Sequence, residues 1–348
     1  MSVGFRQGVS EDPARLAWDA SRPRPLAWTA WYTAAEDAVP TRSSLKSLFR
    51  REAVAVEAPL AASTRSFPLV LLSHGTGATA LALEWLAHRL AQQGYVVLGV
   101  DHHGHTGSET YRAEGFLCMW ERARDLSALL SDLSWRAALG GNIDEDAHLV
   151  GFSAGAYTAM LMVGARIAYS QFEPDNPVKS PIRGPREFPD LADRLPALFD
   201  NPVFREAWER RRDDHSDNRI KSAFAIAPGR SVLGFDRNSL HTIQRPVFLV
   251  AADADRQAPA ECWRFLHDNV GGPTESPKTT KPELDIVHGG VDHYVFLPEA
   301  ALPGFASEPE LFADPPGIQR REVHDHVAEC AIRFFARQPE RIGTTGDV

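Results

Sequence analysis

The segment AHLVGFSAGAYTAMLMVGARIA, Ala147 to Ala168, joins two predicted elements across one sharp turn. AHLVGFS has the apolar pattern of a strand, and AGAYTAMLMVGARIA is typical of a helix. The turn between them, GFSAG, matches G-x-S-x-G, in which a serine occupies a tight strand-to-helix turn and small flanking residues avoid clashes. Gly and Ser also form ordinary turns, but here the strand and the helix supply the context that the motif requires. We therefore predict that Ser153 is a nucleophile.

A serine nucleophile requires a base, and the base requires an acid that orients it. When the serine lies in such a turn, the acid and then the histidine follow along the chain. VFLVAADADRQAP offers Asp253 and Asp255 after a buried strand, and Asp255 lies four residues before Pro259, which opens a predicted helix. That spacing favours Asp255 as the acid and leaves Asp253 to close the turn.

The base is expected in VHGGVDHYVFL, which offers His288 and His293. His293 lies deeper in its loop, whereas His288 is expected to end a strand and to make a local hydrogen bond. The sequence therefore predicts a triad of Ser153, Asp255 and His293.

Negative charge on a tetrahedral intermediate needs two backbone donors. The amide of Ala154 follows Ser153 and begins the predicted helix, whose N-terminal dipole favours negative charge. The second donor is expected in HGTGAT, the loop after the strand FPLVLLS. Thr76 is the natural donor there, and Gly77 would allow the backbone to approach closely.

Apolar strands and helices alternate along the chain from Phe67 onward, which predicts an α/β fold with a mainly parallel sheet and helices on both faces. We interpret residues 1–348 as one domain, in which residues 1–66 contribute the strands RPLAWTAWYTAA and REAVAVEAPL ahead of the alternating part. The expected later strands are FPLVLLSH, YVVLGVD, AHLVGFS, IKSAFAIAP, RPVFLVAAD and KPELDIVH, and the expected helices cover 79–93, 118–139, 154–168, 259–269 and 321–336.

Residues 170–219 interrupt the alternation. The first part is rich in proline and charge, which predicts a loop, and the second part predicts one or two short helices. The segment is either a surface embellishment or a cap over Ser153, and we favour the cap because it carries more apolar residues than a solvated loop needs. The residues expected to shape an apolar pocket are Phe188, Leu191, Leu195, Phe199, Phe204 and Trp208, and substrate contacts are predicted for His74, His103, Phe199 and Trp208.

Two alternatives compete with the serine nucleophile. Gly75, Gly77 and Ala80 fit G-x-G-x-x-A, the spacing at which a dinucleotide-binding fold receives a pyrophosphate, and YVVLGVD ends in Asp101, where a ribose ligand is expected. That interpretation, an NAD(P)-binding oxidoreductase, leaves the predicted triad without a role. The second alternative is a non-catalytic binding protein on the same scaffold.

The motif DHHGHT places His102, His103 and His105 close together. No Asp-His pair follows this motif and no matching ligand cluster occurs elsewhere, so we interpret the three as loop histidines near the mouth of a pocket rather than metal ligands. Asp101, just before them, is then expected to fix the loop. The prediction for metal is none.

Composition excludes several classes of function. The 348 residues are 43% hydrophobic and 24% charged, as in a globular protein, and the net charge of -9 argues against binding nucleic acid. No apolar run approaches the ~20 residues of a membrane span, and the N-terminus lacks a signal-peptide pattern, so a cytoplasmic location is expected. The three cysteines form no CxxC pair, which fits a reducing compartment. A homo-oligomer stays open.

Several segments together resemble the predicted dienelactone hydrolases of bacteria, a group of the α/β-hydrolase superfamily that is similar to the platelet-activating-factor acetylhydrolases. They are the stretch from FPLVLLSHGTGATA to YVVLGVDHHGHT, then MWERARDLSALLSDL, GFSAGAYTAML and GGVDHYVFL. The resemblance covers residues 3–34 and most of 66–300, and WERARDLSALLSDL ties the chain to this group in particular.

The resemblance implies the α/β-hydrolase fold and a triad of Ser153, Asp255 and His293, with an oxyanion hole from the amides of Thr76 and Ala154. It also implies hydrolysis of carboxylic esters of small molecules without metal or organic cofactor. Two departures matter. Dienelactone hydrolases carry a cysteine in place of Ser153, and the acetylhydrolases place their acid after the preceding strand, where SAFAIAPG has none. Both departures argue against carrying over those groups' own substrates.

Overall fold

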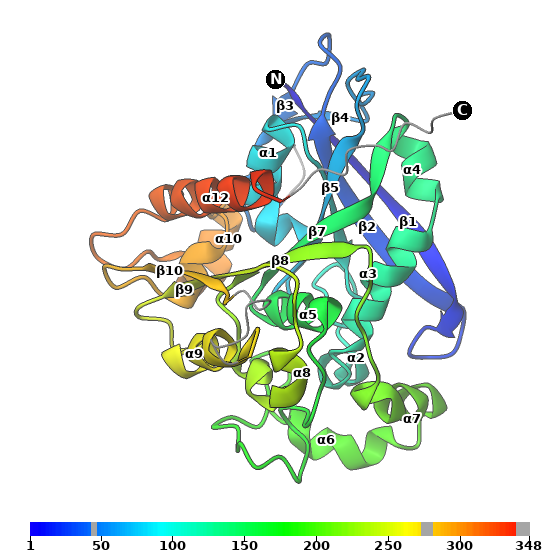
Figure 1. The fold of residues 1–348 in the computed structure, drawn as a ribbon, viewed down its shortest axis with the longest axis vertical. Helices are drawn as coiled ribbons and strands as arrows, with labels where there is room; N and C mark the ends of the chain where they lie inside the picture. Colours follow the sequence, from blue (N-terminus) through cyan, green and yellow to red (C-terminus); the bar gives the residue numbers. More distant parts are fainter. Residues whose placement is uncertain (43–46, 273–280, 339–348) are drawn as a thin grey trace.

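The computed structural model describes residues 1–42, 47–272 and 281–338, so residues 43–46, 273–280 and 339–348 of the predicted domain lie outside the described part. Within that part a ten-stranded sheet runs in the order β10-β9-β8-β7-β5-β6-β2-β1-β4-β3 (Figure 1). From β10 to β6 neighbouring strands are parallel, which confirms the predicted mainly parallel sheet. These strands are β5 (Phe67–Ser73), β6 (Val96–Asp101), β7 (Ile143–Phe152), β8 (Ile220–Ile226), β9 (Val247–Ala252) and β10 (Glu283–Val287).

The N-terminal residues extend the sheet in the antiparallel sense. β1 (Val3–Leu16) and β2 (Pro23–Thr33) form a long hairpin, and β2 pairs antiparallel with β6. β4 (Ala53–Val56) runs parallel to β1, and β3 (Thr41–Arg42) pairs with β4. The two strand predictions in this region are therefore confirmed.

Alternate residues of the parallel strands enter two separate cores. Leu69 and Leu71 of β5 belong to one buried cluster, whereas Val70 and Leu72 belong to another, as the two-residue period of a strand requires. The first core lies under α2 (Ala113–Leu117), α3 (Glu121–Ser131), α4 (Ser134–Leu139), α5 (Ala154–Val163), α8 (Arg237–His241) and α9 (Ala260–Asn269). The second lies under α1 (Glu84–Gln92) and α12 (Arg320–Ala336). Both faces of the sheet are thus covered (Figure 1).

Several predicted helices have different boundaries in the structure. The helix expected over 79–93 starts as a 3-10 helix, Ala80–Leu83, before α1 begins. The helix expected over 118–139 is two helices, α3 and α4, because the chain turns at Asp132 and leaves the helical conformation there. The helix expected over 154–168 ends at Val163, before Gly164.

The segment 170–219 contains α6 (Leu191–Leu198) and α7 (Pro202–Glu209), which lie together at one end of the molecule (Figure 1). The side chain of Asn201 caps α7 by accepting from two of its first amides. Trp208 of α7 packs edge-on against Trp120, with ring centroids 5.5 Å apart. Two short helices, α10 (Leu302–Ser307) and α11 (Pro309–Phe312), precede α12. None of the helices in the described ranges combines the length and the apolar character of a membrane span.

Candidate active site

Ser153 lies in a strained turn between β7 and α5, where its backbone has φ 54° and ψ -111°. Non-glycine residues rarely adopt a positive φ, and such strain concentrates at functional sites. The two glycines of GFSAG are required because a side chain would not fit at either position. A Cβ on Gly151 would lie 2.0 Å from the carbonyl oxygen of Gly155, and one on Gly155 would lie 1.8 Å from that of Ser73. Gly155 therefore packs directly against the end of β5, and Ser153 lies at the cavity.

His293 joins Ser153 to Asp255. The His293 Nδ1 and Asp255 Oδ2 atoms lie 2.7 Å apart, and a carboxylate can only accept, so Nδ1 carries the hydrogen. His293 Nε2 is then free to accept from Ser153 Oγ, which lies 3.0 Å away. Asp255 Oδ1 accepts from the amides of Gln257 and Ala258 at 2.8 Å and 2.7 Å, which fixes the carboxylate. These three side chains can move a proton from serine to histidine and stabilise the resulting cation.

Asp253 serves the neighbouring loop instead. Its carboxylate accepts from the amides of Gly289, Gly290 and Val291 at 2.9–3.0 Å and lies 3.6 Å from the ring of exposed His288. Desolvation acts to raise the pKa of Asp253, but the three amides outweigh it and lower the pKa below its ordinary value. The structure thus pairs Asp255, not Asp253, with His293.

The loop after β5 lies beside Ser153. The amide of Ala78 donates to the carbonyl oxygen of Gly75 at 3.3 Å and closes a turn in which Gly77 has φ +62°, a conformation that favours glycine. A Cβ on Gly75 would lie 3.0 Å from the ring of Phe152, so this loop packs directly against the nucleophile turn. Thr76 and Ala154, the two predicted oxyanion donors, both line the cavity that contains Ser153.

A cavity of about 830 Å³ opens beside Ser153 and His293. The loop of residues 75–79 forms one side, and the first part of the segment 170–219 forms another. Apolar side chains supply much of the lining, among them Leu48, Phe49, Phe116, Met119, Phe172 and Leu297. Such a cavity has the size and the apolar lining of a small-molecule site.

The sequence matches the model of the alpha/beta hydrolase family over residues 69–315, which is most of the chain. The chain belongs to the alpha/beta hydrolase family. Comparison with curated proteins gives no match.

Solved structures share this hydrolase fold. A ferulic acid esterase from Streptomyces cinnamoneus has a TM-score of 0.62 at 18% identity, covering 99% of this chain and 94% of that one. A puromycin hydrolase has a TM-score of 0.52 at 12% identity over 94% of this chain and 38% of that one. A Klebsiella pneumoniae protein assigned as a dienelactone hydrolase has a TM-score of 0.49 at 12% identity, covering 96% and 99%. At these identities the likeness concerns the fold alone.

The two histidines predicted to touch substrate are absent from the described lining of this hydrolase cavity. His74 is fully buried beneath the loop that it begins, and its ring bonds to backbone atoms. His103 is buried too: its Nδ1 bonds to Glu109 at 2.7 Å, and its Nε2 accepts from the amide of Trp18 at 3.3 Å. Both predictions are corrected, because His74 and His103 turn inward, whereas His105, from the same loop as His103, does line the cavity.

The predicted cap contacts are also corrected. Phe199 and Trp208 lie outside the described lining of the cavity, and of the six expected pocket residues only Leu191 lies within it. Phe199 packs edge-on against Phe204 and Trp208, with ring centroids 5.5 Å and 5.9 Å away, so α6 and α7 use their apolar side chains to attach to the core. The pocket wall comes instead from the proline-rich stretch before them, including Gln171, Phe172, Pro181, Ile182, Pro185 and Glu187.

Sequence reasoning missed lining residues that come from distant parts of the chain. Leu48 and Phe49 lie in the connection between β3 and β4, and Tyr294 and Leu297 follow His293. Their position directly after a triad residue could have identified Tyr294 and Leu297. Nothing in the local sequence around Leu48 indicates a pocket. A contact distant in sequence, the isolated bridge between Phe49 and Ala300, brings Leu48 to the cavity.

The dinucleotide alternative conflicts with the turn that suggested it. A Cβ on Gly77 would lie 2.8 Å from the carboxylate of Glu187, so an acidic side chain occupies the approach that a pyrophosphate would need. Asp101 Oδ1 accepts from the amide of Ala80 at 2.7 Å, and its carboxylate therefore fixes the loop rather than facing a ribose. Burial raises the pKa of Asp101, as expected for a structural carboxylate.

Two groups of side chains contain residue types that can bind a metal ion. In DHHGHT, His102 and His103 each bond to a carboxylate and His105 lies against Arg122, whose cation opposes a metal ion. Elsewhere in the described residues, Asp285, His326 and Cys330 bring ligand atoms within 4.8 Å of one another. There His326 already bonds to Asp285, and the Arg333 guanidinium donates to Cys330 Sγ at 3.3 Å. Neither group has the arrangement of a built metal site.

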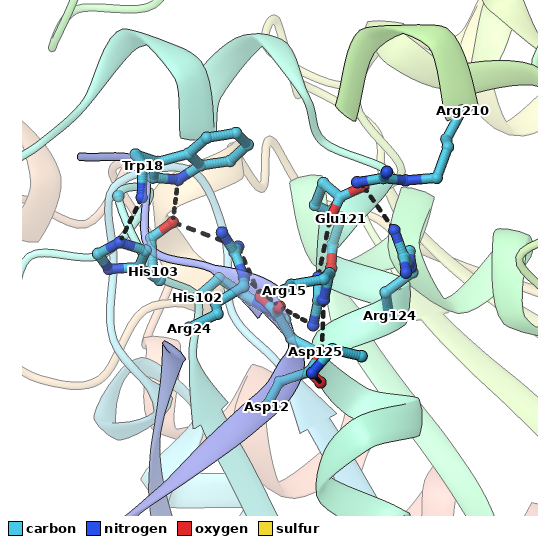
Figure 2. Close-up of polar contacts among 12 residues, drawn as sticks. Asp12, Arg15, Trp18, Arg24, His102, His103, Glu121, Arg124, Asp125 and Arg210 are labelled. Carbon is cyan, nitrogen blue, oxygen red and sulfur yellow. Dashed lines mark hydrogen bonds and ion pairs between the residues drawn. The ribbon is translucent and has the colours of Figure 1, made fainter. Parts of the chain in front are cut away.

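A cluster of buried charges joins the N-terminal hairpin to α3 and to the loop after β6 (Figure 2). Asp125 of α3 pairs with Arg15 and Arg24 of the N-terminal hairpin at 2.8 Å and 2.7 Å, and with His102 at 3.1 Å. Burial acts to raise the pKa of Asp125, but the two arginines outweigh it and hold the pKa well below its ordinary value. Glu121 binds Arg15 from the other side at 2.8 Å. The segment WERARDLSALLSDL therefore ties the hairpin to helix α3, which covers one face of the sheet.

Proposed function

We propose that the chain is a serine hydrolase that cleaves carboxylic esters through an acyl-enzyme intermediate. The observation that carries the proposal is the hydrogen-bonded series Ser153–His293–Asp255 at a cavity of about 830 Å³. The positive φ of Ser153 and the close approach of Gly151 and Gly155 support it, because they expose the hydroxyl as a nucleophile turn does.

Acylation begins when Ser153 Oγ attacks the ester carbonyl and His293 Nε2 takes its proton. Asp255 holds the imidazole in the required tautomer and stabilises the imidazolium. The carbonyl oxygen becomes an oxyanion, which the amides of Thr76 and Ala154 stabilise. The intermediate then collapses, and the alcohol leaves with the proton that His293 returns to it.

Deacylation repeats the same steps with water. His293 takes a proton from the water as it attacks the acyl carbonyl, and the second oxyanion occupies the same hole. Collapse releases the carboxylic acid, and the proton on His293 returns to Ser153 Oγ. No atom of the enzyme is consumed, and the residues named suffice for both half-reactions.

The cavity supports esters or lactones of small to moderate size with an apolar part. Phe116, Met119 and Phe172 provide apolar wall, while Arg186 and Glu187 provide charge in the stretch before α6. We propose that the segment 170–219 acts as a cap, with the stretch before α6 over the cavity and α6 and α7 holding it to the core.

The test compares the wild-type enzyme with Ser153→Ala on p-nitrophenyl esters of increasing chain length, a lactone and an anilide. We expect turnover of short esters by the wild type and its loss in Ser153→Ala, with an unchanged melting temperature. Unchanged hydrolysis in Ser153→Ala would contradict the mechanism. An inactive wild type that also fails to react with a fluorophosphonate would favour the non-catalytic scaffold instead.

A further inference from the structure

A second Ser–His–Asp series lies beneath the loop that carries Thr76. Ser73 Oγ and His102 Nε2 are 2.9 Å apart, and His102 Nδ1 lies 3.1 Å from Asp125 Oδ2. Ser73 ends β5, and His102 directly follows β6, so the parallel strands bring them together at the carboxyl end of the sheet. All three side chains are fully buried. This series uses DHHGHT and WERARD, two motifs that the proposed reaction does not need.

The direction of each hydrogen bond in this series follows from its partners. The Asp125 carboxylate only accepts, so His102 carries its hydrogen on Nδ1, and its Nε2 accepts from the Ser73 hydroxyl. Ser73 Oγ in turn accepts from Arg122 Nη2 at 3.2 Å. Burial beside Arg122 lowers the pKa of His102 to about 3, although Asp125 opposes the shift, so the ring stays neutral at physiological pH.

The backbone of His102 fixes the next ring. Its amide donates to His74 Nε2 at 3.1 Å, which means that Nε2 carries no hydrogen and that Nδ1 must carry it. His74 Nδ1 lies 2.7 Å from the carbonyl oxygen of Gly75 and therefore donates to it. Desolvation, with the nearby Arg122 cation, lowers the pKa of His74 well below its ordinary value and keeps this tautomer neutral.

The carbonyl that His74 holds belongs to the same peptide unit as the Thr76 amide. A trans peptide is planar, and its C=O and N–H point to opposite sides. Fixing the direction of the Gly75 oxygen therefore fixes the direction of the Thr76 N–H. Arg122 also donates to the carbonyl oxygen of His74 itself, so the preceding peptide unit is held as well.

We propose that His74 is a positioning residue, held by the buried Ser73–His102–Asp125 series, which aims the Thr76 amide at the oxyanion. The proposal rests on the proposed ester hydrolysis. His74 does not touch substrate, since it is buried and outside the described cavity lining. Its effect is expected on the transition state, where the oxyanion is fully formed, rather than on substrate binding.

The test compares His74→Leu with His74→Asn in hydrolysis of p-nitrophenyl butyrate. Leucine removes the donor to Gly75, whereas the amide of asparagine places a donor at the position of Nδ1. We expect His74→Leu to lower kcat about 10–100-fold with little change in KM, and His74→Asn to recover most of that loss. The control is His148→Leu, which removes a half-buried histidine of β7 bonded to Ser222 and should leave kcat unchanged.

A second measurement distinguishes a misdirected Thr76 amide from a general disturbance of the active site. An octyl trifluoromethyl ketone forms an oxyanion on Ser153, whereas the matching octyl methyl ketone binds without one. In His74→Leu we expect the inhibition constant of the first to rise in parallel with the fall in kcat, and that of the second to stay constant. If His74→Leu does not fold, Ser73→Ala carries the test, with an expected fall in kcat of about threefold to tenfold.

Two results would overturn the positioning role. One is a kcat for His74→Leu within about twofold of wild type, and the other is an equal loss of affinity for both ketones. Neither result would touch the proposed function, because that fails only if the wild-type esterase activity is absent or does not depend on Ser153.

Discussion

The Ser153–His293–Asp255 and Ser73–His102–Asp125 series join the same kinds of atoms at similar distances. The serine-to-histidine distances are 3.0 Å and 2.9 Å, and the histidine-to-aspartate distances are 2.7 Å and 3.1 Å. Their surroundings differ. Ser153 is partly exposed at a cavity and strained, whereas Ser73 is fully buried at the end of a regular strand.

The charges around the two histidines also differ. Arg15 and Arg24 neutralise Asp125 (Figure 2), and Arg122 donates to Ser73 Oγ, so a proton on His102 would lie close to the cations of Arg122 and Arg24. Asp255 instead bonds to the backbone amides of Gln257 and Ala258 and to His293 within the described part of the chain. A Ser–His–Asp geometry is therefore not enough for catalysis, since the base must be able to hold a proton and the serine must be reachable.

The largest expected effect separates the two serines. Ser153→Ala should lower kcat for p-nitrophenyl butyrate by about four to six orders of magnitude, because the nucleophile is removed. Ser73→Ala should cost at most about tenfold, because that hydroxyl only supports the loop. Steady-state kinetics on both purified variants measure this. Equal losses would show that the buried series takes part in the chemistry directly.

The second effect separates two aspartates in one loop. Asp255→Asn should lower kcat by about 10⁴, since the amide favours the wrong tautomer of His293. Asp253→Asn should leave kcat within about tenfold and act mainly on stability, because that carboxylate holds backbone amides. The same assay measures both variants. A dead Asp253→Asn beside an active Asp255→Asn would reverse the assignment of the acid.

The third effect tests the contact between the nucleophile turn and Ser73, the residue of the buried series that ends β5. A Cβ on Gly155 would lie 1.8 Å from the carbonyl oxygen of Ser73, so Gly155→Ala must push the nucleophile turn away from β5. We expect the free energy of unfolding to fall by about 1–3 kcal/mol, measured by urea denaturation, with loss of esterase activity.

The control for this prediction is Thr158→Ala in the same helix. It removes a buried hydroxyl that bonds to Ala154 at 3.1 Å, and should cost about 1 kcal/mol of stability without loss of activity. A fully active Gly155→Ala would mean that the turn can move without consequence for catalysis.

The smallest effect is the pH dependence of stability. The pKa of His102 is about 3 in the folded chain and near its ordinary value of about 6.5 when unfolded. Below about pH 6.5 the unfolded chain therefore binds a proton that the folded chain does not, and the free energy of unfolding falls as the pH drops. This residue should contribute about 1–2 kcal/mol of loss between about pH 7 and about pH 5.

Urea denaturation of wild type and His102→Asn at both pH values measures this contribution, which the variant should lack. Parallel pH profiles for the two proteins would mean that His102 titrates normally in the folded state.

The parallel sheet and the positions of Ser153, Asp255 and His293, which the structure joins by hydrogen bonds, could be predicted from the sequence because they depend on local patterns. The strands are continuous apolar runs, GFSAG lies between a strand and a helix, and Asp255 and His293 each follow a strand that ends at the same edge of the sheet. The spacing to Pro259 also favoured Asp255 over Asp253, and the structure pairs Asp255 with His293.

The pocket wall and the buried series could not be predicted, because they depend on contacts between distant residues. Phe199 and Trp208 are apolar enough for either a pocket or a core, and only the packing on Trp120 and Phe204 decides between them. The histidines of DHHGHT were expected near the mouth of the pocket because they lie in a loop, but the folded chain buries all three. Arg24, which bonds to the backbone of His103, lies more than seventy residues away in the sequence. The local sequence around DHHGHT therefore gives no sign of the buried charges that surround these histidines.

The central claim is that only one of the two Ser–His–Asp series is reactive. Incubating the wild-type protein with a fluorophosphonate and mapping the adduct by peptide mass spectrometry tests it most directly. We predict one adduct, on the peptide that contains Ser153, and none on the peptide that contains Ser73. An adduct on Ser73, or a reactive protein in which Ser153 stays unlabelled, would contradict the account.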